Sequence, residues 1–233
     1  MRKVNKNQDY RVGFILSAGG SAFEKSVKLS GLSPNKFYVI SDRNCDALTK
    51  ASDLGIAYEK IPFKNHLDFS LKAHNAFLKS GCNIIILHFS RLVTSELFKN
   101  LLTINVHPSI LPAFPGLDAV GDAAKENSLM QGATLHLVDS GIDTGPIIAQ
   151  SIASVPNGAS LEWRHSLAYR QKVLVTLCLL DWLENGLVDL TQKKISAFRS
   201  TRDFTGNILF SQNFNELARK IFFNKVSISM AIT

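Results

Sequence analysis

The chain has 233 residues, of which 45% are hydrophobic and 19% are charged; this composition supports a folded core and excludes a disordered chain. Its three cysteines are far apart in the sequence, and no apolar run approaches the roughly 20 residues of a membrane-spanning helix. We therefore expect a cytoplasmic protein with no disulfide scaffold, no metal site and no membrane partner. Five of the seven net positive charges fall in residues 190–233, which we interpret as a solvated surface rather than a nucleic-acid-binding site.

Short runs rich in Ile, Val and Phe alternate with helical segments through the first hundred residues. Strands are expected at residues 11–17, 37–41, 56–61 and 83–89. Helices are expected at residues 22–29, 45–54 and 66–79. The run 83–89 is nearly continuous in Ile and Leu, which is typical of a central parallel strand. This alternation predicts a doubly wound α/β fold with a mostly parallel central sheet.

The pattern changes after residue 100. A strand at 102–106 leads into a proline-rich loop, and a helix at 118–127 follows, with Asp118 expected to cap its first turn. Two further strands are expected at 133–138 and 147–155, and the longest helix at 160–185. We expect one domain over residues 1–190. A basic C-terminal extension of unassigned structure, 191–233, would follow, with an amphipathic helix at 214–223.

Three segments have the residue types of a functional site. Glycines between the first strand and its helix fit an anion-binding loop and fit a plain tight turn equally well. Asn105 and His107 are two residues apart, so they face the same side at the end of a strand. Asp143 lies in a loop fixed by two glycines and a proline. An amide, an imidazole and a carboxylate form a set suited to acyl transfer, although His107 alone would more often be structural.

The residues of two of these segments resemble a known family. The run NVHPSILPAFPGLDAV, followed by GATLHLVDSGIDTGPIIAQ, is similar to the formyltransferases that use 10-formyltetrahydrofolate. The resemblance covers roughly residues 11–190 and is strongest to the phosphoribosylglycinamide formyltransferases of purine biosynthesis. It implies a metal-independent transferase in which Asn105, His107 and Asp143 are catalytic.

The same resemblance implies a folate pocket. Its residues would be Arg91, Leu92, Val93, Leu102, Ile104, Val138, Asp139, Ser140 and Gly141. For Leu102 and Ile104, an ordinary core position is an equally good interpretation. Thr134 and His136 would support the active-site strand rather than transfer protons. The acceptor would be a small primary amine, and Ser17, Gly19, Gly20 and Ser21 would hold its phosphate if it carries one.

The acceptor residues depart from the family pattern. The first loop reads SAGGSA where relatives acting on glycinamide ribonucleotide read SGNGSN, and Lys172 stands where those relatives carry a glutamate. A cation cannot accept hydrogen bonds from ribose hydroxyls. Another amine, such as a nucleotide-linked amino sugar, and a non-catalytic binding protein therefore remain as alternatives. A dinucleotide-dependent oxidoreductase, with Asp42 after the second strand, is disfavoured because the chain lacks the GxGxxG pattern. The oligomeric state is left open.

Overall fold

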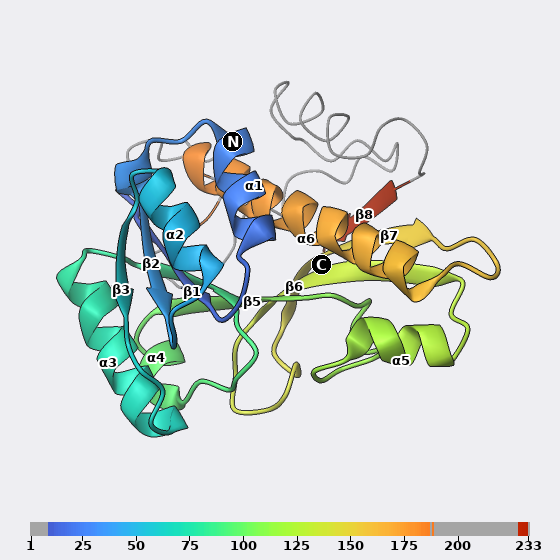
Figure 1. The fold of residues 1–233 in the computed structure, drawn as a ribbon, viewed down its shortest axis with the longest axis horizontal. Coiled ribbons are helices and arrows are strands. Elements are labelled where there is room, and N and C mark those ends of the chain that lie inside the picture. Colours follow the sequence, from blue (N-terminus) through green and yellow to red (C-terminus); the bar gives the residue numbers. More distant parts are fainter. Residues whose placement is uncertain (1–8, 187, 189–227, 233) are drawn as a thin grey trace, which may run out of the picture. The chain divides into compact units, whose positions relative to one another are not determined.

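A computed structural model describes residues 9–186, 188 and 228–232 of the chain (Figure 1). These residues form two compact units. The N-terminal unit holds residues 9–106 and 136–146, and the C-terminal unit holds 107–135 and the described residues from 147 onward. The expected domain boundary at residue 190 and the expected helix at 214–223 lie outside the described residues.

The N-terminal unit is built on parallel strands. They are β1 (Val12–Leu16), β2 (Phe37–Ser41), β3 (Ala57–Lys60), β4 (Ile84–His88) and β5 (Leu102–His107). Their order is β3-β2-β1-β4-β5, and each neighbouring pair is parallel. The chain thus runs outward from β1 to β3 and then returns to β4 on the other side of β1. This reversal is a topological switch point, and ligands bind open α/β sheets at such points.

Helices cover both faces of these strands. They are α1 (Ser21–Ser30), α2 (Asp46–Asp53), α3 (His66–Lys79) and the short α4 (Ser95–Phe98). Successive residues of β1 point to opposite faces: the Phe14 ring packs 4.9 Å from Phe23 of α1, while Ile15 joins a core cluster with Phe69 and Phe77 of α3. Figure 1 shows α1 and α2 on one face and α3 and α4 on the other. The predicted doubly wound α/β class is confirmed.

Two helix starts agree with the sequence prediction and one does not. The side chains of Asn65 and Ser160 accept hydrogen bonds from backbone amides in the first turns of α3 and α6 (Leu161–Glu184), at 2.8 and 3.1 Å. Asp118 precedes α5 (Ala119–Lys125) but makes no capping hydrogen bond, so that prediction is wrong. Its carboxylate instead lies 3.7 Å from the Lys125 ammonium.

The C-terminal unit contains α5, α6 and the remaining strands. These strands are β6 (Met130–Leu137), whose last two residues belong to the other unit, β7 (Ile147–Ser154) and β8 (Ile228–Ile232). β8 pairs antiparallel with β7, with Ala149 opposite Ile232, and this strand was not predicted from the sequence. α6 packs against α5 and β7. Among the described helices, none is long and apolar enough to cross a membrane.

Candidate active site

Asn105 of β5 and Asp143 of the loop between β6 and β7 meet in the N-terminal unit. The Asn105 Nδ2 donates to Asp143 Oδ1 at 3.1 Å, and the same nitrogen lies 3.1 Å from His136 Nε2. The Asp143 backbone has a φ of 55°, a left-handed conformation in which Asp is enriched several-fold over most residues. Two of the three predicted catalytic residues are therefore in direct contact, although 38 residues separate them in the sequence.

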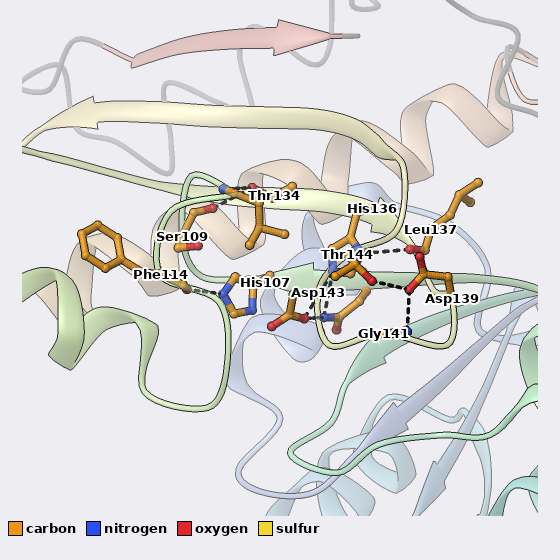
Figure 2. Close-up of polar contacts among 12 residues, drawn as sticks. His107, Ser109, Phe114, Thr134, His136, Leu137, Asp139, Gly141, Asp143 and Thr144 are labelled. Atoms are coloured by element: carbon orange, nitrogen blue, oxygen red, sulfur yellow. Dashed lines mark hydrogen bonds and ion pairs between the residues drawn. The ribbon is translucent and has the colours of Figure 1, made fainter.

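His136 completes this group (Figure 2). Its Nδ1 lies 2.9 Å from the Leu137 carbonyl, which can only accept, so Nδ1 carries a hydrogen. In the neutral ring Nε2 is then the acceptor and takes the second Asn105 Nδ2 hydrogen. Nε2 is also 3.5 Å from Asp143 Oδ1, so a second proton on His136 would bond to that carboxylate. The expected supporting position of His136 agrees with this geometry.

His107, at the end of β5, is held by its neighbours in the C-terminal unit. Its Nε2 lies 2.8 Å from the Phe114 carbonyl, as Figure 2 shows. Because a carbonyl only accepts, Nε2 carries a hydrogen, and Nδ1 is the nitrogen that changes between acceptor and donor on protonation. Phe114 has a φ of 55°, which is uncommon for a non-glycine residue and costs roughly 1–3 kcal/mol. The loop thus holds a strained residue whose carbonyl orients His107.

The loop after His107 is fastened by Thr134 of β6. The buried Thr134 hydroxyl donates to the Ser109 carbonyl at 2.7 Å and accepts from the Leu111 amide at 3.2 Å. Gln150 of β7 adds a hydrogen bond of 2.8 Å from its Nε2 to the Leu111 carbonyl. Thr134 therefore holds the loop that follows His107, rather than the strand β5 that it was expected to support. The contribution of Gln150 could not be predicted, because it depends on which strands are neighbours.

We expect Thr134→Val to lower the free energy of unfolding by about 1–3 kcal/mol, because its shape is kept while the Ser109 carbonyl and Leu111 amide lose their partner. Urea unfolding measures this difference. Thr103→Val is the matched control, since the equally buried Thr103 hydroxyl makes one local hydrogen bond, to the Leu101 carbonyl. Equal losses in the two variants would show that the bonds from Thr134 to the loop contribute nothing specific.

The Asp139–Pro146 loop is shaped by its own side chains. Asp139 Oδ1 accepts from the Gly141 amide at 3.0 Å and from the Thr144 hydroxyl at 2.8 Å (Figure 2). A Cβ on Gly141 would lie 2.0 Å from Thr144 Oγ1, and one on Gly145 would lie 1.7 Å from the Leu137 carbonyl oxygen. The glycines are required because backbone and side chains approach so closely. Asp139 therefore has a structural task besides its predicted contact with folate.

Residues of α2 contact the glycine loop between β1 and α1. Gly20 has a φ of 63°, and a Cβ there would lie 2.7 Å from the Ala47 Cβ of α2. The Lys50 ammonium, also on α2, donates to the Gly19 carbonyl at 2.6 Å and to Ser21 Oγ at 3.1 Å. Sequence reasoning missed Lys50, which brings a positive charge to the predicted phosphate loop.

The predicted folate residues fall into two groups. Arg91 and Leu92 are partly exposed beyond the end of β4, where a ligand can reach them, and Val93 is half-buried there. Leu102 and Ile104 are buried in β5, with Ile104 fully inaccessible. This burial favours the core interpretation for Leu102 and Ile104. Val138, Ser140 and Gly141 retain partial or full exposure along the Asp139–Pro146 loop and just before it.

Two charged residues bear on the alternatives. The Asp42 carboxylate is 1% exposed and binds Arg43 and Arg91, so it is not available to a nucleotide ribose, and this disfavours the dinucleotide interpretation. Lys172 of α6 is half-buried and forms no hydrogen bond or ion pair with any described residue. Burial lowers the pKa of Lys172, because removal from water disfavours the charged ammonium.

Comparison with known proteins identifies the family. A model of the formyl transferase family matches residues 10–166, which is more than half of the chain. The chain belongs to the formyl transferase family. This confirms the family resemblance inferred from the sequence motifs.

Several relatives of the chain are named phosphoribosylglycinamide formyltransferase. Phosphoribosylglycinamide formyltransferase of Bacillus subtilis is 39% identical over 109 residues, 46% of this chain and 53% of the relative. The Mycobacterium tuberculosis H37Rv enzyme of the same name is 33% identical over 131 residues, 53% of this chain and 60% of that protein. A solved phosphoribosylglycinamide formyltransferase from Bacillus halodurans superposes with a TM-score of 0.65 at 27% identity, over 75% of this chain and 97% of its own. The chain thus aligns with little more than half the length of the curated relatives.

Proposed function

We propose that the protein transfers a formyl group from 10-formyltetrahydrofolate to a primary amine, as the names of its relatives suggest. The observation that carries the proposal is the contact of Asn105 with Asp143, which joins the two family motifs at one point. The reacting domain would comprise residues 1–190. The amine would attack the formyl carbon of the donor directly, without a covalent enzyme intermediate, and the bond from that carbon to the folate nitrogen would break to release tetrahydrofolate.

The chain has groups that fit a folate donor. The Nη1 and Nη2 atoms of Arg91 have no partner among the described residues, and folate carries carboxylates that such a fork can bind. The segment from Ser140 to Ile142 is exposed and offers backbone groups for a pterin ring. Among the described residues, no group of His, Cys, Asp and Glu side chains is arranged to hold a metal ion.

Each predicted catalytic residue would have a different role in the reaction. Asn105 has two Nδ2 hydrogens; one remains on Asp143, and a formyl oxygen can take the second in place of His136. Protonated His107 would donate from Nδ1 to the oxyanion. Asp143 would accept the proton that the attacking amine loses. A preorganised oxyanion donor is worth roughly 3–4 kcal/mol of barrier height.

The acceptor is the part of the reaction that needs a direct test. Glycinamide ribonucleotide is favoured by the names of the relatives, whereas Lys172 favours an amine with a second anionic group, such as a nucleotide-linked amino sugar. The test is a turnover assay with 10-formyltetrahydrofolate and a panel containing both types of acceptor. Failure with every member, where a known relative is active, would leave a non-catalytic binding protein.

We expect a non-reactive 10-substituted folate analogue to protect the Asp139–Pro146 loop from hydrogen exchange. Loops at the ligand end of a sheet lose local opening motions when a ligand contacts their backbone. Exchange measured by mass spectrometry with and without the analogue gives the result, and α5 serves as an internal reference. Binding of the analogue with unchanged exchange in the loop would place the pterin elsewhere.

A further inference from the structure

Asp42, just beyond β2, joins two arginines on one buried carboxylate. Its Oδ2 accepts from Arg91 Nε at 2.8 Å and from Arg43 Nη2 at 2.6 Å, while its Oδ1 accepts from Arg43 Nε at 2.9 Å. Burial alone would raise the pKa of Asp42, but the two arginines outweigh it and the pKa is lowered. The carboxylate is therefore charged at neutral pH, and the cluster has one positive charge in excess.

The two arginines are held differently. Arg43 donates from both Nε and Nη2 to the Asp42 carboxylate. This bidentate contact points the Arg43 guanidinium at the carboxylate. Arg91 uses only Nε, and its guanidinium carbon lies 4.2 Å from the centre of the Phe63 ring. Its two terminal nitrogens have no partner among the described residues, and its side chain is 37% exposed. Among the described residues, nothing occupies Nη1 and Nη2 of Arg91, so these two nitrogens can bind a ligand.

The groups that hold Arg91 are themselves joined. The Phe63 amide donates to the Asp42 carbonyl at 3.4 Å, so the ring and the carboxylate come from segments that are bonded to each other. The side chain of a free arginine samples many rotamers, and fixing it costs conformational entropy on binding. A hydrogen bond at Nε and a ring beneath the guanidinium remove most of that freedom before a ligand arrives.

We infer that Asp42 is a positioning residue that, together with Phe63, orients the terminal nitrogens of Arg91 toward a carboxylate of the folate donor. The identity of that ligand rests on the proposed function. Asp42 itself does not touch the donor. Its effect passes entirely through Arg91, so its removal should weaken donor binding and leave the chemical step unchanged.

The test is the affinity of the purified protein for a non-reactive 10-substituted folate analogue, measured by calorimetry. We expect Asp42→Asn to weaken binding about tenfold, because the amide keeps the shape but loses the charge that holds Nε. The KM for the formyl donor should rise in parallel while kcat stays within about twofold. Arg43→Ala is the matched control: it removes the other arginine from the same carboxylate and should change affinity by less than about twofold.

Two further measurements separate positioning from a general structural effect. In an Arg91→Ala background, Asp42→Asn should add no further loss, and an analogue without the glutamyl carboxylates should bind wild type and Asp42→Asn equally. A full additional loss in that background, or wild-type affinity in Asp42→Asn, would overturn the inference. If Asp42→Asn fails to fold, Phe63→Leu replaces it, with about a threefold loss expected that again requires Arg91. Because the analogue needs no turnover, binding without catalysis would count against the proposed function and not against this role of Asp42.

Discussion

We expect Asp143→Asn to lower kcat/KM for formyl transfer by at least about a hundredfold. The substitution keeps the size of the side chain, but the amide cannot take the proton released by the attacking amine. It also replaces one acceptor oxygen with a donor beside Asn105 and His136, so the short contacts of the group must rearrange. The rate is measured by following loss of the formyl donor at saturating acceptor.

His107→Ala is expected to cause a loss of similar size, because it removes the donor to the oxyanion and leaves the Phe114 carbonyl without its partner. Matched controls are Asp122→Asn on α5, whose side chain is 45% exposed, and His165→Ala at an exposed position of α6; both lie outside the site. Circular dichroism should show unchanged folding in all four proteins. A near-normal rate in either site variant would remove that residue from the mechanism.

Much of this site could be predicted because it depends on short-range sequence patterns. Asn105 and His107 are two residues apart on a strand, and the period of a strand puts them on one side. The start of α6 follows from Ser160, whose side chain accepts from the Trp163 amide in the first turn. Gly141 and Gly145 reflect close approaches within the Asp139–Pro146 loop and to the end of the strand before it. Local geometry alone decides each of these features.

Other contacts depend on which strands become neighbours. Asp42 and Arg91 are 49 residues apart, and they meet because β2 and β4 both end near β1. Lys50 reaches the glycine loop from a helix 31 residues away. No hydrophobic period and no fixed spacing in the sequence predicts such pairs of residues. The resemblance predicted that Arg91 lines a folate pocket, whereas its contacts with Asp42 and Phe63 required the three-dimensional structure.

The sequence resemblance predicts that Lys172 takes the place of a glutamate found in relatives that act on glycinamide ribonucleotide. Its ammonium is half-buried on α6, has no partner among the described residues, and has a pKa lowered by burial. An uncompensated charge in that position is unfavourable, and a bound anion would relieve it. A ribose diol carries no charge to offset it: its oxygens could accept from the ammonium, but its hydroxyl hydrogens would find no acceptor on Lys172.

We expect glycinamide ribonucleotide to be used with a weak Michaelis constant and Lys172→Glu to lower that constant. A hydroxyl left without an acceptor costs about 1–3 kcal/mol, so restoring the carboxylate should gain roughly tenfold to a hundredfold in affinity. The same substitution should raise the constant for an acceptor with a second anionic group. Initial rates with both acceptors measure the two changes.

Lys172→Met distinguishes the loss of the cation from the gain of a carboxylate. It keeps an unbranched side chain of similar length, so it should weaken the anionic acceptor and leave glycinamide ribonucleotide nearly unchanged. It should also stabilise the fold by about 0.5–2 kcal/mol, since it removes a half-buried charge that has no partner among the described residues. A wild-type enzyme that saturates at micromolar glycinamide ribonucleotide, with no gain from Lys172→Glu, would refute the altered acceptor. The acceptor would then be glycinamide ribonucleotide, as the relatives' names suggest, and Lys172 would have no part in selecting it.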